Sequence, residues 1–358
     1  MTDLERAIQV LEGGLVTPRR TLRQRMASHR VPGFSIALID RGELAWAKGY
    51  GVLEAGGDEA VTTETIFQAA SISKPVTAMV ACALVEAGLL DLDADVNDIL
   101  RSWKVPKSKH TLVRKVTLRG LLSHTAGLGV RGYPGYPSGV QLPTLQQVLE
   151  GKPPARSKPV RVEQAPGTGF LYSGGGYLAV QQMIEDVTGR SLAGLAQELI
   201  FDKLGMANST FDSLLPEAYI PQAATAHRRG GEPVPGRWHT YPEQATASLW
   251  STPSDLARLV VEVLKSYGGE SNLVHSAEMT REMLTPQVSW VGLGFPIIHE
   301  HGTTKIEHPG WNEGFHSLFV ACLDTGQGLV WMTNGAKGKQ LGREVMHALP
   351  KAFGWSGY

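Results

Sequence analysis

Both ends of this 358-residue chain carry strand-like sequence, and the presence of such sequence at both ends constrains the fold more than any other feature. Residues 32–52, PGFSIALIDRGELAWAKGYGV, contain two β-rich runs around Asp40–Glu43, where Gly42 suits the tip of a hairpin. Residues 292–334 contain four more runs, LGFPII, KIEHPG, HSLFVACLD and GLVWMTN, with a turn at Asp324–Gly328. We therefore expect one antiparallel sheet that is built from both chain ends.

The middle of the chain has helical periodicity instead. Apolar spacing predicts helices over residues 76–90, 176–187 and 192–199. Shorter helical segments are expected after Thr117 and after Thr252, where the sequence TPSD is typical of a helix start. Because these helices separate the two strand-rich ends, the sheet must form around an inserted helical region.

This order of elements predicts an α+β fold with two closely connected parts. Residues 1–70 and 235–358 are assigned to an α/β sheet domain, and residues 71–234 to a mainly helical domain, with the functional site between them. Residues 133–161 are rich in proline and glycine, so we expect them to form a long surface loop.

Charge and hydropathy exclude several classes of partner. The 34 basic and 34 acidic side chains balance, so no basic excess indicates nucleic acid. The longest apolar run, Val76–Val85, is shorter than the ~20 residues that span a bilayer.

The N-terminal sequence MTDLERAIQVLEGG suits a helix and lacks the basic start of an export signal, which favours a cytoplasmic location. Cys82 and Cys322 suit small core residues in a reducing compartment.

Ser71 and Lys74 stand where an apolar helix begins, in FQAASISKPVTAMVACALVEAG of residues 67–88. Residues three apart share a helix face, with Cβ atoms about 5–6 Å apart, so the two side chains can touch. The helix dipole and the apolar surroundings favour an uncharged amine, which can take a proton from serine. This is the arrangement of an activated nucleophile. The competing interpretation is a serine that caps the helix and a lysine that extends to solvent.

Two further stretches carry polar residues among glycines. PGTGFLYSGGGY, residues 166–177, places Tyr172 on a loop before a helix, where the phenol can meet another part of the fold or simply pack at the helix entry. HPGWNEGF, residues 308–315, lies between two strand-like runs. Its glycines suit a strand whose backbone approaches a substrate closely, or else a bulge or hairpin.

Together these stretches resemble the serine β-lactamase-like hydrolases, which include class C β-lactamases, penicillin-binding D,D-peptidases, D-aminopeptidases and family VIII carboxylesterases. Ser71-Ile72-Ser73-Lys74 is similar to the first motif of the family, Tyr172-Ser173-Gly174 to the second and His308-Pro309-Gly310 to the third. The phrases VTLRGLLSHTAGL, FDKLGMANSTF and LWSTPSDLARL also resemble the family, and the resemblance runs from about residue 31 to residue 334. It implies the β-lactamase/D,D-peptidase-like fold.

The resemblance also implies a mechanism through an acyl-enzyme. Ser71 would be the nucleophile, Lys74 its general base and Tyr172 a proton shuttle. The substrate-binding positions that it implies are Ser71 and Trp311, whose backbone N–H groups would hold the oxyanion, together with His308, Gly310 and Gly174. No metal or other cofactor is expected.

Two positions depart from the family pattern. Gly174 replaces a common asparagine, and glycine has no side-chain donor or acceptor for an acylamide group. His308 replaces the lysine of β-lactamases, and a neutral imidazole binds a substrate carboxylate less strongly than an ammonium. With the expected cytoplasmic location, these departures favour a carboxylesterase that acts on small or medium acyl esters.

Two alternatives remain beside the carboxylesterase. One is a D-aminopeptidase, D,D-peptidase or weak β-lactamase acting on amides, and the other is a non-catalytic binding protein with the same fold. The expected partner is a small-molecule ester, with neither nucleic acid nor a membrane. The sequence leaves the oligomeric state open.

Four other side chains invite a functional interpretation. Trp311, Trp250 and Phe315 suit an apolar substrate pocket and the core equally well. His124, in LLSHTAGL, belongs to a stretch that is mainly structural in the family, so it is not assigned a catalytic role.

Two apparent cofactor patterns are interpreted as accidental. His299 and His301 share a strand face but have no clear carboxylate partner, so we expect solvent-facing side chains and not metal ligands. GGGYLA at residues 174–179 matches a dinucleotide-binding pattern, but no apolar strand precedes it and no βαβ unit surrounds it.

Overall fold

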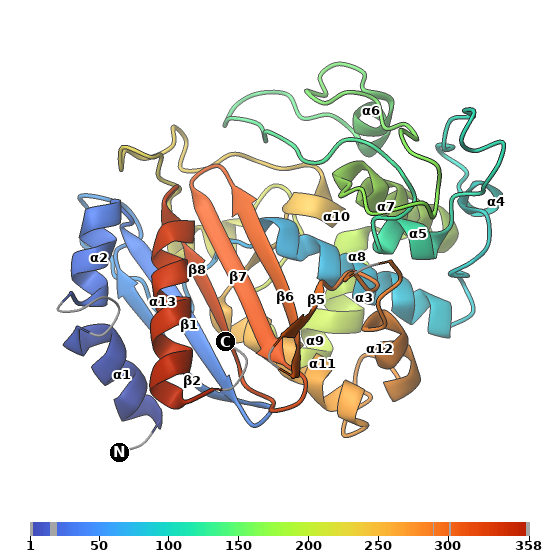
Figure 1. The fold of residues 1–358 in the computed structure, drawn as a ribbon. Coiled ribbons are helices and arrows are strands. Elements are labelled where there is room, and N and C mark those ends of the chain that lie inside the picture. The colour runs from blue at the N-terminus through green and yellow to red at the C-terminus, as the bar shows by residue number, and fades with distance from the viewer. Residues whose placement is uncertain (1–2, 15–19, 289, 301, 356–358) are drawn as a thin grey trace.

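A six-stranded antiparallel sheet joins the two ends of the chain, as the sequence predicts (Figure 1). The computed structural model describes residues 3–14, 20–288, 290–300 and 302–355. The strand order is β2-β1-β8-β7-β6-β5, so the N-terminal hairpin pairs with the last strand. The strands of this sheet are β1 (Gly33–Asp40), β2 (Glu43–Gly51), β5 (Ile297–Glu300), β6 (Thr303–Asn312), β7 (Phe315–Cys322) and β8 (Gly328–Thr333).

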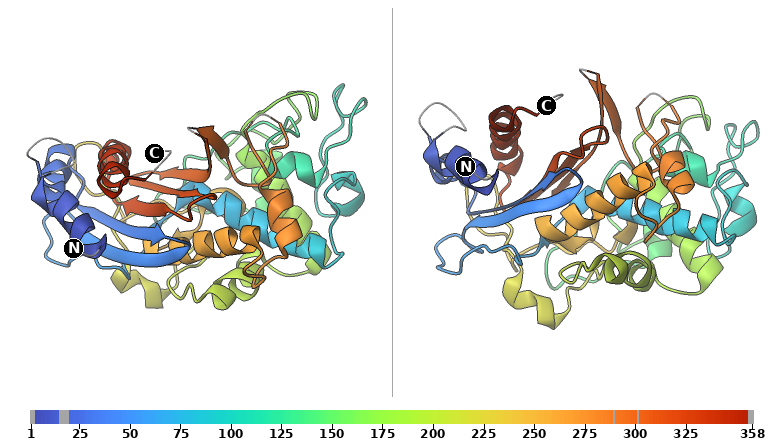
Figure 2. Two further views of the ribbon diagram at one scale, coloured as in Figure 1. Left: turned by 60° about the horizontal axis from the view of Figure 1, so that its bottom comes forward. Right: turned by 90° about the horizontal axis from the view of Figure 1, so that it is seen from below.

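Helices cover both faces of the sheet (Figure 2). The terminal helices α1 (Asp3–Gly13), α2 (Leu22–His29) and α13 (Gly338–Phe353) lie on one face, and α11 (Pro253–Gly268) lies on the other. An apolar cluster fills the space on each side. This two-sided burial explains why β1 has a nearly continuous apolar sequence instead of an alternating one.

The helical region is built around α3 (Ser73–Glu86), which α7 (Gly174–Thr188), α8 (Leu192–Ala196) and α10 (Gln244–Ala247) contact. Because α3 is apolar on all sides, it can only be stable when it is enclosed, and nearly all its side chains are buried. The other elements here are α4 (Val96–Ile99), α5 (Leu118–Leu122), α6 (Leu145–Glu150), α9 (Asp202–Leu204), α12 (Ala277–Met283) and the small sheet of β3 (Phe67–Gln68) and β4 (Trp250–Ser251).

The predicted helix starts at Thr117 and Thr252 are confirmed. In each case the threonine hydroxyl accepts a hydrogen bond from a backbone N–H three residues later, of Gly120 and Asp255 respectively. This cap satisfies one of the amides that the first helical turn leaves without an intrahelical partner.

Three details differ from the predictions. The run LGFPII becomes a strand only from Ile297, because Gly294 adopts φ +87° and turns the chain against α3. The helix expected at 192–199 ends at residue 196 and continues as a π-helical turn, Gln197–Phe201. The loop 133–161 contains a helix, α6, which begins with a capping box formed by Thr144 and Gln147.

Two predictions concern the chain as a whole. The domain boundaries at residues 70/71 and 234/235 stay predictions. Within the part of the chain that the structure describes, no helix combines the length and the apolar composition that crossing a membrane requires.

Candidate active site

Ser71 and Lys74 are in contact, as their spacing predicts. Ser71 lies in a single 3₁₀ turn, η1 (Ala70–Ile72), which leads directly into α3. Lys74 Nζ donates a hydrogen bond to Ser71 Oγ over 3.1 Å. Neither serine of this stretch caps the helix through its side chain, so the competing interpretation of a helix cap is not what the structure shows.

Lys74 does not extend to solvent, because its side chain is only 1% exposed. Nζ also donates to the backbone oxygen of Thr246 over 3.0 Å, and it lies 5.0 Å from the ring centre of Tyr172 and 5.9 Å from that of Tyr177. Its polar contacts among the described residues are therefore two uncharged oxygens, and none is a carboxylate. A buried lysine without a counterion is costly for the fold and indicates a functional role.

The turn that carries Ser71 is held in a strained conformation. Ala70 adopts φ +52°, a left-handed value that residues with a side chain rarely take. Ser73 Oγ donates to Ala70 O over 2.6 Å and accepts from the backbone N–H of Leu249 over 3.0 Å. The Ser73 hydroxyl therefore connects the turn that carries Ser71 to the segment that enters β4.

Tyr172 lies on the loop before α7, and His124 fixes both of its neighbours in the chain. The backbone N–H of Leu171 donates to His124 O over 2.8 Å, and that of Ser173 donates to His124 Nδ1 over 3.0 Å. The imidazole ring lies 4.4 Å from the ring of Tyr172. The sequence assigns His124 a structural role and not a catalytic one. The contacts show what that structural role is, because they set the position of Tyr172.

His124 is uncharged in this environment. Burial lowers its pKa well below the ordinary value, and the nearby Lys74 and His308 lower it further. Because Nδ1 accepts the Ser173 N–H, the ring proton resides on Nε2. The residue itself adopts φ +59°, so its backbone is as constrained as its ring.

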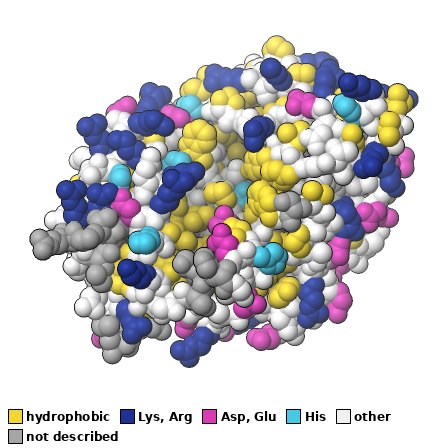
Figure 3. Space-filling model, viewed as in Figure 1, with side chains coloured by type: hydrophobic (Ala, Val, Ile, Leu, Met, Phe, Trp, Pro, Cys, Tyr) yellow, Lys and Arg dark blue, Asp and Glu magenta, His cyan; other side chains and the backbone are white. Residues whose placement is uncertain are grey.

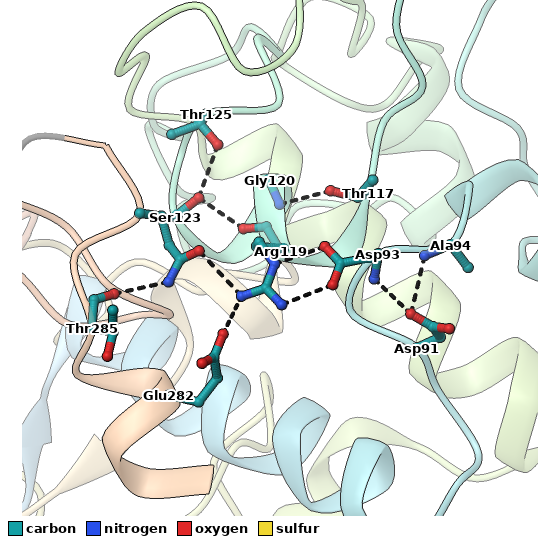
Figure 4. Close-up of polar contacts among 11 residues, drawn as sticks. Asp91, Asp93, Ala94, Thr117, Arg119, Gly120, Ser123, Thr125, Glu282 and Thr285 are labelled. Carbon is teal, nitrogen blue, oxygen red and sulfur yellow. Dashed lines mark hydrogen bonds and ion pairs between the residues drawn. The ribbon is translucent and has the colours of Figure 1, made fainter. Parts of the chain in front are cut away.

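A polar network supports the segment that ends at His124 (Figure 4). Arg119 forms two hydrogen bonds with Asp93, at 2.7 and 2.8 Å, and also contacts Glu282 of α12. Ser123 Oγ donates to Arg119 O over 2.7 Å and is 2.9 Å from Thr125 Oγ1. These contacts tie α5 to α12 and to the loop before α4.

The HPG stretch lies within β6, not in a turn between strands, and Gly310 explains the placement of that strand. A Cβ on Gly310 would stand 2.1 Å from Ala69 O, so glycine alone permits β6 to lie this close to the Ser71 turn. Asn312 then anchors the end of the strand, because its Nδ2 donates to Gln68 Oε1 and to Ala247 O.

His308 is buried on the same strand and is uncharged. Burial, followed by the charge of Lys74, lowers its pKa to about 3. Its Nδ1 donates to Pro309 O over 2.8 Å. His308 and Gly174 are absent from the set of described residues that line the cleft around Ser71, although the sequence placed both beside the substrate.

Gly174 is the first residue of α7, and its surroundings leave little room for a side chain. A Cβ there would stand 3.0 Å from Tyr133 Cε2 and 3.1 Å from Thr246 Oγ1. The Tyr133 ring thus occupies space beside position 174, where the family often has an asparagine. Thr246 is also the residue whose carbonyl accepts from Lys74, so packing at Gly174 is linked to the catalytic candidates.

A cleft of about 910 Å³ opens over Ser71, and hydrophobic side chains gather around the middle of this face (Figure 3). Trp311 lines it with a side chain that is 69% exposed. Trp250 and Phe315 are instead buried and pack edge to face in the core. The described residues that line the cleft include Ser71, Lys74, Arg131, Tyr133, Tyr172, Thr246, Pro309, Gly310, Trp311, Leu318, Trp331, Lys339, Arg343 and Met346.

Several of these residues could not have been found from the sequence. Tyr133 and Thr246 come from segments without a recognisable motif, and Lys339, Arg343 and Met346 come from a terminal helix whose sequence indicates only amphipathicity. Arg131 follows the motif LLSHTAGL closely in the sequence, and this proximity is the one local signal for a cleft residue. The sequence does not show that the Arg131 side chain lies at the cleft.

His299 is exposed on β5 and lies 3.2 Å from Thr304 Oγ1. His301 lies outside the described residues. Within the described part of the chain, no group of three or more His, Cys, Asp or Glu side chains is arranged to hold a metal ion.

The chain matches a protein-family model described as Beta-lactamase over residues 18–349. It is similar to "Penicillin-binding protein 4" of Amycolatopsis lactamdurans, with 31% identity over 61% of this chain and 55% of that protein. It is also similar to "Esterase EstB" of Burkholderia gladioli, with 30% identity over 59% of this chain and 54% of that protein. The chain therefore spans about half the length of the curated relatives it matches.

Solved structures have the same fold. The "octameric penicillin-binding protein homologue from Pyrococcus abyssi" superimposes with a TM-score of 0.76 at 25% identity, over 93% of this chain and 76% of that one. "EstCE1, a hydrolase with promiscuous acyltransferase activity" superimposes with a TM-score of 0.74 at 19% identity, over 97% and 98% of the two chains. The match of the family model covers nearly the whole sequence, and the chain belongs to the Beta-lactamase family.

Proposed function

We propose that this protein is a serine hydrolase that works through an acyl-enzyme, and that its substrates are carboxylic esters with small or medium acyl groups. The observation that carries the proposal is the 3.1 Å contact between Lys74 Nζ and Ser71 Oγ beside an apolar cleft. A serine hydroxyl is a weak nucleophile by itself, and an adjacent base makes it reactive.

The proposed reaction has two stages. In the first, Ser71 Oγ attacks the ester carbonyl while the Lys74 amine accepts the hydroxyl proton; the alcohol then leaves with a proton that Lys74 or Tyr172 returns to it. In the second, water attacks the acyl group on Ser71 and gives a proton to the same pair. The bond between the acyl carbon and Ser71 Oγ then breaks, the carboxylic acid leaves, and the pair returns the proton to Ser71 Oγ. The backbone N–H groups of Ser71 and Trp311 are proposed to hold the negative oxygen in both stages.

The surroundings of the cleft favour a simple ester over a substrate that carries an acylamide side chain. Position 174 offers no side-chain amide, and Tyr133 and Thr246 occupy the space beside it. His308 carries no positive charge that could hold a substrate carboxylate, since its pKa is lowered to about 3. Pro309, Trp311, Leu318 and Met346 give the cleft an apolar wall that suits an acyl chain or an alkyl alcohol.

A specific observation favours a second candidate, an amide hydrolase such as a D-aminopeptidase, D,D-peptidase or weak β-lactamase. Arg131, Lys339 and Arg343 line the cleft and offer positive charge for an anionic substrate. Relatives named as a penicillin-binding protein and as a putative D-alanyl-D-alanine carboxypeptidase support this candidate as well.

The proposed location is a reducing compartment such as the cytoplasm. Cys82 and Cys322 are both buried free thiols, and neither takes part in a disulfide. Free buried cysteines are common where thiols are kept reduced, and this supports the proposal.

Two measurements on the purified protein test the proposed function. Labelling with a fluorophosphonate, followed by mass spectrometry, should place the adduct on Ser71 and not on the folded Ser71→Ala variant. Failure to label folded protein would favour a non-catalytic binding protein instead. Turnover of p-nitrophenyl acetate and butyrate should exceed that of nitrocefin and D-Ala-p-nitroanilide, and dominant turnover of the latter two would favour the amide hydrolase.

A further inference from the structure

Charge is distributed very unevenly along this chain. Residues 99–161 contain 12 Lys and Arg residues but only one carboxylate, Glu150. The remaining residues hold 22 cations against 33 carboxylates, so the neutral total conceals a strongly basic segment. The absence of a basic excess in the whole chain therefore says nothing about this part of the surface.

The basic segment forms one end of the molecule, opposite the terminal helices (Figure 1). The loop 107–115 carries exposed cations at Lys107, Lys109, Arg114 and Lys115. A neighbouring hollow is lined by four cations from two separate segments, Arg101, Lys104, Lys152 and Arg161, and by one carboxylate, Glu150, which pairs with Lys152. Lys and Arg side chains follow the upper and right-hand edges of this face (Figure 3).

The loop 107–115 also presents two adjacent aliphatic side chains to solvent. Leu112 is 81% exposed and Val113 is 78% exposed. Backbone hydrogen bonds from Leu112 to Ser108 and from Arg114 to His110 hold the loop in an ordered turn. Scattered exposed aliphatic residues need no explanation, but an adjacent pair at an ordered tip among four cations does.

From this arrangement we infer that the loop 107–115 docks the protein on an anionic lipid surface. Leu112 and Val113 enter the boundary between headgroups and acyl chains, while Lys107, Lys109, Arg114 and Lys115 contact the headgroup phosphates. Peripheral membrane binding increases with buried apolar area and with attraction between cations and anionic lipids, and this loop supplies both. A dissolved polyanion would use the cations alone and leave the aliphatic pair exposed.

Arg131, another cation of the basic segment, is exposed and lines the cleft above Ser71. Docking through the loop 107–115 requires no inserted helix. This differs from the expectation of no membrane partner, which rested on the absence of an apolar segment long enough to span a bilayer.

Flotation of the full chain with lipid vesicles tests the inference. The protein should float with vesicles of phosphatidylcholine mixed with phosphatidylglycerol, but not with phosphatidylcholine alone. High salt should release it, because the screening length falls from about 8 Å at 0.15 M to about 3 Å at 1 M. If the protein does not bind the mixed vesicles at low salt, the inference is wrong.

Two variants separate the apolar from the cationic contribution. Leu112→Ser with Val113→Ser, and the charge variant Lys107→Gln, Lys109→Gln, Arg114→Gln and Lys115→Gln, should each weaken binding about tenfold or more. A matched control neutralises four exposed cations elsewhere, namely Arg20→Gln, Arg23→Gln, Arg229→Gln and Lys351→Gln. It should bind like the unmodified protein, and equal weakening would show a nonspecific charge effect and overturn the inference.

Folding and the identity of the ligand need their own readouts. Circular dichroism, thermal unfolding and turnover of a dissolved p-nitrophenyl ester should be unchanged in the aliphatic and charge variants. Binding of polyphosphate should be much weaker than binding of mixed vesicles and should not depend on Leu112 and Val113. Retention of vesicle binding by the Leu112→Ser, Val113→Ser variant would make the surface a general polyanion site and overturn the docking model.

Discussion

Gly310 of β6 lies so close to Ala69 that a Cβ on the glycine would stand 2.1 Å from the alanine carbonyl oxygen. The same Cβ would be 2.2 Å from Ser317 Oγ, so two different segments already fill the space that a side chain would need. This contact sets the distance between β6, which carries Trp311, and the turn that carries Ser71. The proposed oxyanion donors therefore depend on a residue that has no side chain.

Gly310→Ala should move β6 away from the Ser71 turn and reduce turnover. Loss of one oxyanion donor raises the barrier by about 2.7–4 kcal/mol, so we expect kcat to fall about 100-fold or more with p-nitrophenyl butyrate. Gly268→Ala is a matched control, because a Cβ there would meet only ordinary contacts at 3.7 Å or more. Similar kinetics in both variants would show that the spacing of β6 and η1 is unimportant for catalysis.

Lys74→Met should separate activity from stability. Removing the base should lower kcat by about 1,000-fold or more, because Ser71 then lacks an activating partner. The buried amine has only uncharged partners among the described residues, so its replacement by an apolar side chain of similar length should leave the free energy of unfolding unchanged or raise it by about 1 kcal/mol. Urea denaturation measures this effect, and a large loss of stability would contradict it.

His124 offers a test of how Tyr172 is positioned. His124→Ala leaves the buried N–H of Ser173 without an acceptor, which should cost about 1–3 kcal/mol of stability and lower kcat several-fold with little change in KM. His124→Asn should restore both, because its side-chain oxygen can accept that N–H and asparagine tolerates the observed φ of +59°. Complete loss of turnover in a folded His124→Ala variant would instead indicate a direct chemical role.

Ser71, Lys74 and Tyr172 could be selected from the sequence because each belongs to a short local pattern. The contacts that organise them could not. Lys74 donates to Thr246 O across 172 positions, and Ser173 donates to His124 across 49. Thr246 acts through its backbone carbonyl, which no side-chain pattern reveals. The sheet was predictable because β-rich runs and the turn residues between them are local signals, but the approach of Gly310 to Ala69 depends on how two distant segments pack.

Glu243 should make stability depend on pH. Its carboxylate is 1% exposed, its oxygens have no hydrogen-bond partner among the described residues, and burial raises its pKa to about 8. Between about pH 4.5 and 8 the folded protein keeps this proton while the unfolded chain releases it. Its contribution should therefore lower the free energy of unfolding by about 1.4 kcal/mol per pH unit across this window.

Glu243→Gln should remove that dependence and be more stable than the original protein at pH 8. His308 has a lowered pKa, so its contribution raises the free energy of unfolding as the pH rises from about 3 to 6.5. Both proteins contain His308, so the difference between their stability curves reports on Glu243 alone. Denaturant unfolding at a series of pH values provides the measurement. Parallel stability curves for the two proteins would show that Glu243 is ionised in both the folded and the unfolded state.

Substrate preference should change when the space beside Gly174 is redesigned. Gly174→Asn alone should lower ester turnover, because its Cβ meets Tyr133 at 3.0 Å and Thr246 at 3.1 Å, and Thr246 also contacts Lys74. Adding Tyr133→Ala removes the first obstacle and lets the new amide face the cleft. We expect the double variant to regain ester turnover and to increase its ratio of nitrocefin to ester hydrolysis, with Tyr133→Ala alone as the control. The single variant Tyr133→Ala enlarges the cleft without adding an amide. If it changes the ratio as much as the double variant does, the volume of the cleft determines the preference and the missing amide does not.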